Sequence, residues 1–388
     1  MPRPKAIAAI VGDSDLRFSD GNRITVYDNG RDGLDAMLAP IEAAKSRVHL
    51  ETYILRADAT GRRFLSALER HARAGREVRV LYDALGSFGL DESALEPLRA
   101  AGGEVVAFNP LARFWPRFAP RRRDHRKILI VDGEVAFTGG LNIGDEYLSG
   151  LGAPETPGAW RDAHARVEGP CVRDLEAVFL ESWFRADGPA MPWHMLLSPS
   201  RSSVGSVRCA VLADGPTYRR RRTRDLLISL LRETEREVRL VSPYFHPGRR
   251  VLEVLAAASA RGVRVSLLLA GQRTDHDSLR RATHAVLPKL LECGVHVYEY
   301  DEEMMHAKVA CFDEDFAIVG SSNLDRQSFE RSYEVNLVID DAGVAKGLRD
   351  RFDADVARAR RVDLETLAQR APLERMLDWM ASLLLRWI

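Results

Sequence analysis

The sequence contains the stretch His125-Arg-Lys127-Ile-Leu-Ile-Val-Asp132, followed after six residues by Gly139-Gly-Leu-Asn142. The same arrangement returns as His306-Ala-Lys308-Val-Ala-Cys-Phe-Asp313, followed after six residues by Gly320-Ser-Ser-Asn323. Every equivalent pair is 181 residues apart, so the motif itself contains no insertion or deletion. One histidine two positions before a lysine carries little information, whereas two copies in identical register indicate two halves of related structure.

The spacing within each copy predicts one polar strand face. Side chains two positions apart on a strand point to the same side, so each histidine should lie beside its lysine. The asparagine follows a glycine-containing turn, which returns it to the same region. If the halves pack about a pseudo-two-fold axis, one pocket collects the paired histidines, lysines and asparagines: His125, His306, Lys127, Lys308, Asn142 and Asn323.

Such a pocket suits a phosphodiester. One neutral imidazole can attack phosphorus, the second can protonate the leaving alcohol, and the lysines and asparagines can hold the non-bridging oxygens as charge develops. No group of carboxylates has the spacing of metal ligands, so we expect the two lysines to replace a divalent ion. The sequence therefore predicts a metal-independent enzyme that needs no cofactor.

The basic residues support this interpretation, because the chain has 50 Arg and only 6 Lys. Lysine is a compact point charge and arginine a wide planar fork, so a chain that keeps lysine at two matched positions has a reason for it. Asp132 and Asp313 complete the motif and are counted with the catalytic candidates. Their distance from the lysine places them on the opposite strand face or in the turn, where they should fix the turn.

The repeat extends beyond the motif. Equivalent strands are expected at 47–53 and 237–244, 77–82 and 263–269, and 104–108 and 295–298, with helices between them at 64–74, 95–101, 251–260 and 284–293. Strands that alternate with helices indicate βαβ units. The predicted fold class is α/β, with two similar halves, each a mixed, mostly parallel sheet covered by helices, sharing one active site at their interface.

The expected boundaries follow from composition. The first domain covers 20–185, a Pro/Ser/Gly-rich linker covers 186–205, the second domain covers 206–345, and a C-terminal amphipathic helical tail covers 362–388. In the tail, apolar residues from Leu373 to Ile388 recur at intervals of three and four, which is typical of one helical stripe. The stripe either lies in a membrane interface or packs on the body of the protein.

Composition excludes several classes of protein. The 388 residues are 46% hydrophobic, which is enough for a sizeable core, and 56 basic residues balance 56 acidic ones. Non-specific binding of nucleic acid through a global basic field is therefore not expected. No apolar run reaches the roughly 20 residues that span a bilayer. The four cysteines show neither metal nor disulfide spacing, which favours a reduced, intracellular protein.

The paired HxKx4Dx6G(G/S)xN motifs resemble the phospholipase D superfamily. Further segments resemble the bacterial cardiolipin synthases, and the similarity covers the chain from about residue 20 onwards: Leu50–Ile54, Tyr82–Ser87, Arg123–Lys127, Trp160–Asp162, Val167–Pro170, Ser242–Phe245 and Ser321–Asp325. The sequence departs from the family where Arg326-Gln-Ser-Phe329 replaces an arginine directly before Ser-Phe. This difference bears on substrate preference.

The resemblance implies an activity and further site residues. It implies a phosphatidyltransferase that makes cardiolipin from phosphatidylglycerol, or from a related phosphatidyl donor, through a phosphohistidine, with the histidine of the first half as nucleophile. It also implies that Asp162 and Glu334 orient the two histidines. The resemblance is to a short form without N-terminal membrane spans, attached peripherally to the cytoplasmic face of the membrane. The alternative is a phospholipase D-type phosphodiesterase that hydrolyses phospholipids or nucleic acid.

Two basic segments lie outside the motifs. Arginines mix with aromatic residues and prolines in 113–123, which suits either a loop at a phospholipid surface or a solvated loop. A second run at 218–224 precedes an apolar helix and is best interpreted as a solvated helix start. Oligomeric state and the donor and acceptor lipids are left open by the sequence.

Overall fold

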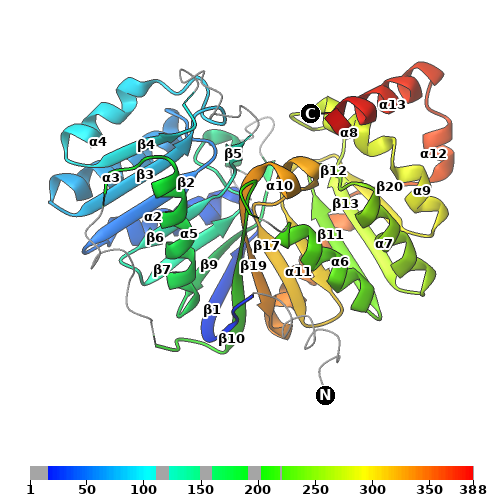
Figure 1. The fold of residues 1–388 in the computed structure, drawn as a ribbon, viewed down its shortest axis with the longest axis horizontal. Helices are drawn as coiled ribbons and strands as arrows, with labels where there is room; N and C mark the ends of the chain where they lie inside the picture. The colour runs from blue at the N-terminus through cyan, green and yellow to red at the C-terminus, as the bar shows by residue number, and fades with distance from the viewer. Residues whose placement is uncertain (1–15, 111–121, 149–159, 191–201, 219–220, 388) are drawn as a thin grey trace.

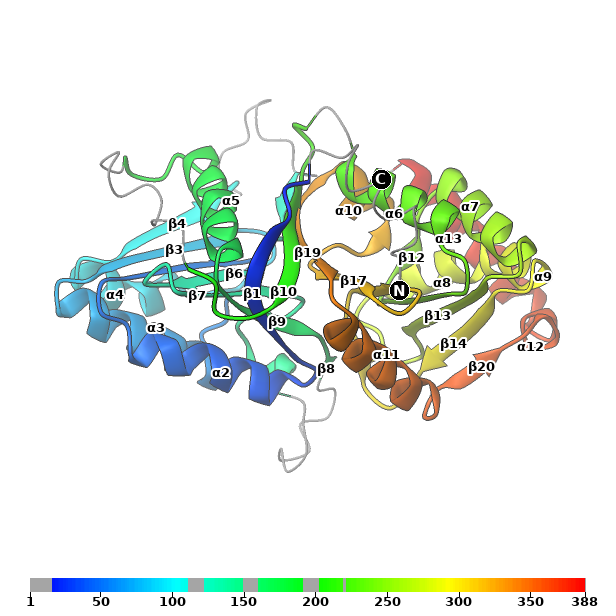
Figure 2. The same cartoon turned by 90° about the horizontal axis from the view of Figure 1, so that it is seen from below.

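The computed structural model describes residues 16–110, 122–148, 160–190, 202–218 and 221–387. Two halves of similar size lie side by side in Figure 1. Within the described residues, one mixed sheet of sixteen strands runs through both halves, and helices cover its faces (Figure 2). The fold class is therefore α/β, as the sequence predicts, but the two halves share one sheet, whose strands pair antiparallel as well as parallel.

The first half begins at β1 and ends with α5. Its strands are β1 (Ser19–Tyr27), β2 (Arg47–Thr52), β3 (Glu77–Asp83), β4 (Glu104–Phe108), β5 (Arg123–Asp124), β6 (Ile128–Val131), β7 (Val135–Gly139), β8 (Trp160–Arg161) and β9 (His164–Glu168). Its helices are α2 (Gly30–Glu42), α3 (Ala59–Arg73), η1 (Glu92–Leu95), α4 (Glu96–Ala100), η2 (Asp145–Tyr147) and α5 (Cys171–Arg185).

The second half begins at β10. Its strands are β10 (Val207–Asp214), β11 (Glu237–Ser242), β12 (Phe245–His246), β13 (Arg264–Ala270), β14 (His296–Tyr300), β15 (Met304–Met305), β16 (Val309–Phe312), β17 (Phe316–Gly320), β18 (Leu324–Asp325), β19 (Ser332–Asp340) and β20 (Arg360–Val362). Its helices are α6 (Arg222–Glu233), α7 (Arg249–Ala260), α8 (Asp277–His284), α9 (Leu287–Glu292), α10 (Arg326–Glu330), α11 (Ala342–Val356), α12 (Leu364–Ala368) and α13 (Pro372–Trp387).

The two halves repeat one topology. Parallel pairing joins β2, β3 and β4 in the first half and β11, β13 and β14 in the second. The motif strands β6 and β16 run antiparallel to β2 and β11, and each pairs with the strand that follows it, β7 or β17. Antiparallel pairing of β1 with β10 joins the halves into one sheet.

Several helices begin where the sequence supplies a capping side chain. Asn29, Asp58 and Asp341 precede α2, α3 and α11, and each accepts a hydrogen bond from a backbone N–H in the first turn. Such caps satisfy donors that have no partner inside the helix. They fix where each helix starts relative to the strand before it.

The structure corrects two predicted helices. The helix expected at 284–293 is the shorter α9, which begins only at Leu287, because the preceding helix α8 ends at His284. Pro288 stands in the first turn of α9, and its ring cannot continue an unbroken helix. The helix expected at 95–101 is the 3-10 turn η1 followed by α4.

The C-terminal tail is also more varied than predicted. It opens with β20, which extends the sheet by pairing antiparallel with β14, and continues through α12 into α13. The long helix is therefore confined to the last part of the chain. The linker expected at 186–205 and the arginine- and aromatic-rich segment at 113–123 lie largely outside the described residues.

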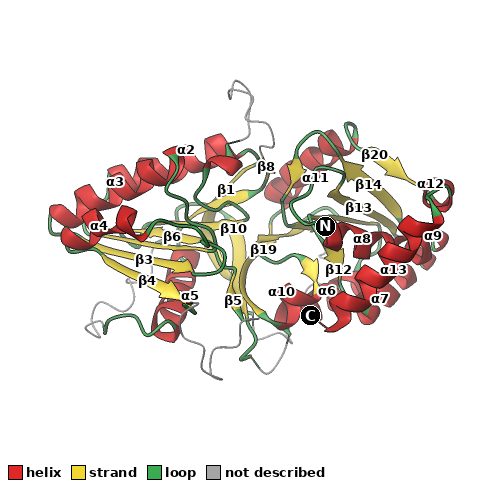
Figure 3. Cartoon of the chain, turned by 90° about the horizontal axis from the view of Figure 1, so that it is seen from above, coloured by secondary structure: helices red, strands yellow, loops and turns green. Residues whose placement is uncertain are grey.

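Two short strand pairings cross between the halves. β5 of the first half pairs with β19 of the second, and β15 of the second half pairs with β8 of the first. Directly after these pairings, the backbone N–H of His125 donates to the carbonyl of Tyr333 at 2.9 Å, and that of His306 to the carbonyl of Arg161 at 2.7 Å. Each motif histidine is thus fixed to the backbone of the other half. Figure 3 shows β5, β8, β10 and β19 gathered where the halves meet.

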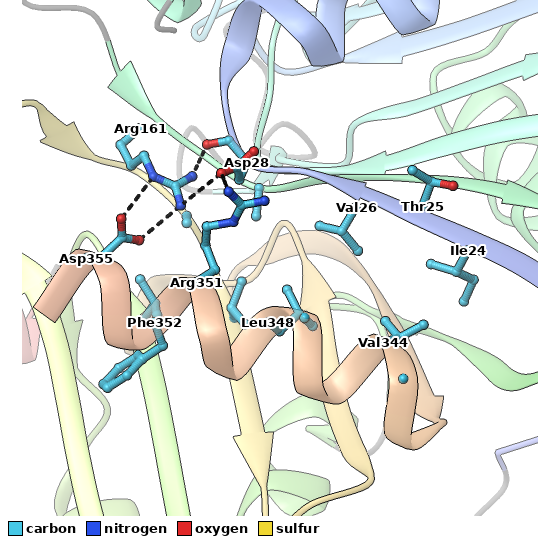
Figure 4. Close-up of a pocket in the computed structure, with 16 residues that line it drawn as sticks. Ile24, Thr25, Val26, Asp28, Arg161, Val344, Leu348, Arg351, Phe352 and Asp355 are labelled. Carbon is cyan, nitrogen blue, oxygen red and sulfur yellow. Dashed lines mark hydrogen bonds and ion pairs between the residues drawn. The ribbon is translucent and has the colours of Figure 1, made fainter. Parts of the chain in front are cut away.

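A partly buried ion cluster supports one of these crossings. A cavity of about 380 Å³ lies between β1 and α11, and its polar end joins both halves (Figure 4). Arg161 pairs with Asp355 at 3.0 Å and lies 3.8 Å from Asp28, which also binds Arg351. Because Arg161 belongs to β8, the cluster holds β8 and the residue after it, Asp162, in place.

Candidate active site

The two motif histidines line one cavity of about 750 Å³ between the halves. Other residues of its wall come from both halves and include Tyr53, Asn142, Tyr244 and Asn323. Both histidines are largely buried, with side chains 13% and 5% exposed. The structure therefore brings the two copies of the motif to one site. That site lies between the halves, and neither half forms it alone.

A carboxylate of the opposite half contacts each histidine. Nδ1 of His125 lies 3.1 Å from Glu334, which is on β19, and Nδ1 of His306 lies 2.6 Å from Asp162, which follows β8. A hydrogen bond at Nδ1 fixes the ring and leaves Nε2 as the reactive nitrogen. The pairing is reciprocal, so neither half holds a complete histidine–carboxylate pair by itself.

The repeated Gly-Gly and Gly-Ser positions explain how the carboxylates fit. Gly140 lies against Asp162, and a Cβ built there would stand 1.9 Å from its Oδ1. The equivalent residue in the second copy is Ser321, whose hydroxyl donates to Glu334. The first half leaves space for Asp162 at this motif position, and the second half supplies a hydrogen bond to Glu334. The position therefore accommodates the carboxylate rather than the substrate.

We expect Gly140→Ala to lower kcat by about 10- to 100-fold, because the added methyl group must displace Asp162 and with it the imidazole of His306. The matched control is Gly347→Ala in α11, where a Cβ would meet no atom within 4 Å. That control should keep full activity and should not lower the melting temperature. Steady-state kinetics and thermal unfolding of both variants provide the measurement, and equal activities would contradict the positioning role of residue 140.

The motif lysines lie behind the histidines. Lys127 and Lys308 are 2% and 4% exposed, and each donates to the carbonyl oxygen of the histidine two residues earlier. Nζ of Lys127 also lies 5.2 Å from the centre of the Tyr53 ring. Burial lowers the pKa of Lys127 to about 7 and that of Lys308 to about 8, while Glu334 and Asp162 oppose the shift. Burial of the two positive charges therefore costs free energy. Such a cost is expected for lysines that bind an anionic group.

The carboxyl groups of the two histidine–carboxylate pairs differ in acidity. Burial raises the pKa of Glu334 to about 8, with Lys127 opposing. Burial would also raise the pKa of Asp162, but Lys308 and His306 outweigh it and hold that pKa below its usual value. The pKa values of the two carboxyl groups are therefore shifted in opposite directions, and Asp162 is the more acidic of the two. Burial and then the lysine charges lower the pKa of His306 to about 4 and that of His125 well below its ordinary value.

The two asparagines are not equivalent. The amide of Asn142 accepts from the backbone N–H of Ile54 at 3.0 Å and donates to the hydroxyl of Tyr147 at 2.5 Å. Asn323 is 6% exposed, and its Oδ1 has no hydrogen-bond partner among the described residues. Asn323 is consequently the one with free capacity toward a bound molecule, and Asn142 chiefly holds the wall of the cavity.

The structure corrects the grouping of Asp132 and Asp313 with the catalytic residues. Each stands at the far end of its motif strand with a positive φ, 54° and 48°. Asp132 accepts from the backbone N–H groups of residues 45–47, and Asp313 from those of residues 235–237. Neither lines the cavity. Each aspartate instead fixes the start of a neighbouring strand, β2 or β11.

Some residues of the cavity wall were not predicted. Tyr53 and Tyr244 are equivalent in the two halves, and their recurrence 191 residues apart in the sequence was the signal that could have found them. The hydroxyl of Tyr244 donates to Asp275 at 2.5 Å. Asp275 and His276 lie in a loop before α8, and nothing in the repeat marks them. No group of three His, Cys, Asp or Glu side chains in the described part of the chain has the arrangement of a metal site.

The fold and the duplicated histidine–lysine site define a phospholipase D-like protein. A family described as "Cardiolipin synthase, PLD-like domain" matches residues 37–150 and 227–356, which contain both motifs. The chain therefore belongs to the phospholipase D-like cardiolipin synthase family. The matched ranges also separate two repeated segments, one in each half of the chain.

Individual proteins agree with this assignment. A cardiolipin synthase of Geobacillus kaustophilus is 36% identical over 94% of this chain and 72% of its own length. A cardiolipin synthase 1 of Bacillus cereus is 31% identical over 93% of this chain and 71% of its own length. A phosphatidylserine synthase structure from Haemophilus influenzae shares the fold, with a TM-score of 0.74, 12% identity, and coverage of 99% of this chain and 97% of that one.

Proposed function

We propose that this protein is a phosphatidyltransferase that makes cardiolipin from phosphatidylglycerol through a phosphohistidine intermediate. The observation that carries the proposal is the pair of buried histidines in one cavity, each held at Nδ1 by a carboxylate of the other half. Membership of the cardiolipin synthase family supports the choice of lipid. The proposed site residues are those predicted from the sequence, without Asp132 and Asp313 and with Asn142 as a residue that holds the cavity wall.

In the first step, Nε2 of His125 attacks the phosphorus of one phosphatidylglycerol. The bond from phosphorus to the glycerol oxygen breaks, and His306 gives that oxygen its proton. In the second step, His306 takes the proton from a hydroxyl of another phosphatidylglycerol, and that oxygen displaces His125 from phosphorus. Cardiolipin and glycerol leave, and both histidines return to their starting states.

The charges of the site support this division of roles. A general acid must be protonated before the reaction, and ionised Asp162 stabilises an imidazolium at His306. An incoming phosphodiester adds further negative charge, which raises the lowered pKa of His306. Lys127 and Lys308 each have three N–H donors, of which one reaches a backbone carbonyl. Nζ of Lys308 also lies 2.9 Å from Nδ1 of His306, and we assign a remaining donor of each lysine to the non-bridging oxygens.

We place the protein peripherally at the cytoplasmic face of the membrane, where phosphatidylglycerol is available as donor and acceptor. No helix in the described residues is long and apolar enough to cross a bilayer. The cavity of about 750 Å³ has room for a headgroup and the first part of its acyl chains.

The test is to offer the protein phosphatidylglycerol vesicles and labelled single-stranded DNA together. We expect equal amounts of cardiolipin and glycerol to form while the DNA stays intact. Production of phosphatidic acid without cardiolipin would show a hydrolase, and cleavage of the DNA would show a nuclease. Chromatography of the lipids and gel analysis of the DNA distinguish these outcomes, and the second and third would overturn the proposal.

The pH dependence follows from the lysines. A lysine is charged below its pKa, so kcat/KM should fall as pH rises through the values of Lys127 and Lys308, about 7 and about 8. On the acid side, kcat/KM should fall as the nucleophile His125 becomes protonated, at a pH well below the ordinary histidine pKa, because burial and the charge of Lys127 lower the pKa of His125. The optimum is thus expected on the acid side of neutrality. Measurement of kcat/KM with a monomeric short-chain phosphatidylglycerol tests this, and an alkaline limb at the ordinary lysine value of about 10.4 would contradict it.

A further inference from the structure

The last helix of the chain has its polar side inward. In α13, Asp378 and Ser382 are 4% and 6% exposed. Its large apolar side chains are turned outward: Leu373 is 61% exposed, Trp379 60%, Met376 50%, Met380 44% and Leu377 38%. An ordinary surface helix shows the opposite distribution, because its apolar stripe faces the core. The stripe predicted from the sequence is therefore present in this part of α13, but it is not the packing face.

Polar contacts hold α13 in this orientation. Asp378 binds Arg370, and the hydroxyl of Ser382 lies 3.4 Å from Nε2 of His246. The same Asp378 lies 3.9 Å from Arg281 of α8. These contacts fix the outward direction of the apolar residues, so their exposure does not come from a loosely attached tail.

The position of α13 relates this face to the catalytic cavity. α13 lies on α8 at the outer surface of the second half (Figure 1). Leu279 of α8 and His246 of β12 both line the cavity, so α13 is the next layer outside its wall. On the other half, Leu85 also lines the cavity and is 44% exposed, and nearby Phe88 is 71% exposed. Exposed apolar side chains therefore occur beside the cavity in both halves.

We propose that the exposed residues of α13, together with Leu85 and Phe88, form a docking face for the surface of a phospholipid bilayer. This inference rests on the proposed function, because lipid substrates must enter the cavity from a bilayer. Isolated exposed apolar residues need no explanation, but a run of five on one helix beside a catalytic cavity marks an interaction surface. Trp379 suits the headgroup region, where tryptophan is enriched.

A bilayer fits this face better than a second protein chain. The apolar residues belong to separate elements of both halves, Leu85 in the cavity wall and α13 one layer outside it, so a protein that covered both groups would obstruct substrate entry. A bilayer contacts both groups and also supplies the substrate. A helix of 16 residues that presents one apolar side is suited to lie in the interface rather than to cross it.

The test uses Trp379→Glu with Met380→Glu on α13, and Phe88→Glu on the other half. Val204→Glu is the matched control, since Val204 is 40% exposed and lies next to the end of β10 farthest from Glu334. Binding to vesicles of equal parts phosphatidylglycerol and phosphatidylcholine is measured by sedimentation at low and high salt. We expect the α13 double variant to bind at least about tenfold more weakly at both salt concentrations, Phe88→Glu to bind more weakly, and the control to bind as the parent does.

Turnover separates docking from chemistry. All variants should process monomeric dihexanoyl phosphatidylglycerol at the parental rate, and the docking variants should lose activity only on vesicles. Unchanged vesicle binding in both docking variants would overturn the proposal, as would conversion of a dimer to a monomer with binding retained, which would assign the face to a second copy. If the α13 double variant unfolds, vesicle binding by Phe88→Glu alone decides whether the docking face is correct. Loss of binding in variants of a parent that turns over no lipid would sustain the docking face and refute the proposed function.

Discussion

Replacement of either cavity histidine by alanine should lower turnover of phosphatidylglycerol by about 10⁴-fold or more, because one variant lacks the nucleophile and the other the proton donor. The variants should differ in the intermediate that they can reach. His125→Ala should form no covalent phosphatidyl–protein adduct at all. His306→Ala should form one from a substrate with an activated leaving group, and the adduct should accumulate because no base remains to activate the acceptor hydroxyl.

The adduct is measured by alkaline quenching of the reaction with labelled substrate, since phosphohistidine survives base better than acid. His296→Ala is the matched control, because His296 lies on β14 and does not line the cavity. It should behave as the parent protein does. If the adduct is lost in His306→Ala and kept in His125→Ala, the two roles are exchanged. If either variant turns over phosphatidylglycerol at the parental rate, the phosphohistidine mechanism is wrong.

The sequence predicted the halves and the motif because both depend on local spacing. Two side chains at positions i and i+2 of a strand share a face in any sheet, so His125 and Lys127 could be placed together before the fold was known. The repeat then required a second set at His306 and Lys308. The other site residues could not be placed from local spacing, because tertiary packing positions them. That packing depends on contacts between residues far apart in the chain.

The histidine–carboxylate pairs show the limit of this reasoning. Asp162 reaches His306 across 144 residues and Glu334 reaches His125 across 209. The strands that arrange these contacts, β5, β8 and β15, have only two residues each, which is too short for any periodicity. The resemblance to a known family suggested the two carboxylates. Only the crossed pairing of β8 with β15 and of β5 with β19 explains why each carboxylate contacts the histidine of the other half.

The final helix shows a different limit. Periodicity correctly groups the apolar residues of α13 on one side, but it does not state which side packs on the protein. That choice depends on partners elsewhere in the chain, here Arg281, Arg370 and His246, which satisfy Asp378 and Ser382 inside the structure. A helix with these partners is held by its polar side, and its apolar side stays outside.

Replacement of Lys127 or Lys308 by arginine should lower kcat by about 10²- to 10³-fold, although the charge is kept. Each lysine is almost fully buried, and each ammonium group is fitted against the carbonyl oxygen of the preceding motif histidine. A guanidinium is wider and planar, so it cannot occupy this space and also reach the same oxygens. Loss of one donor to a developing oxyanion costs about 2.7–4 kcal/mol in the transition state.

Lys346→Arg is the control, because that side chain is 67% exposed and pairs with Asp350 on the surface of α11. It should leave kcat unchanged. The residual activity of Lys127→Arg provides a second measurement: arginine does not titrate in the accessible range, so the alkaline limb near pH 7 should disappear and the limb set by Lys308 near pH 8 should remain. If all three substitutions have the same small effect, the lysines do not serve the phosphate. If kcat falls but the alkaline limb stays near pH 7, another group sets that limb, and the lowered pKa of Lys127 has no part in catalysis.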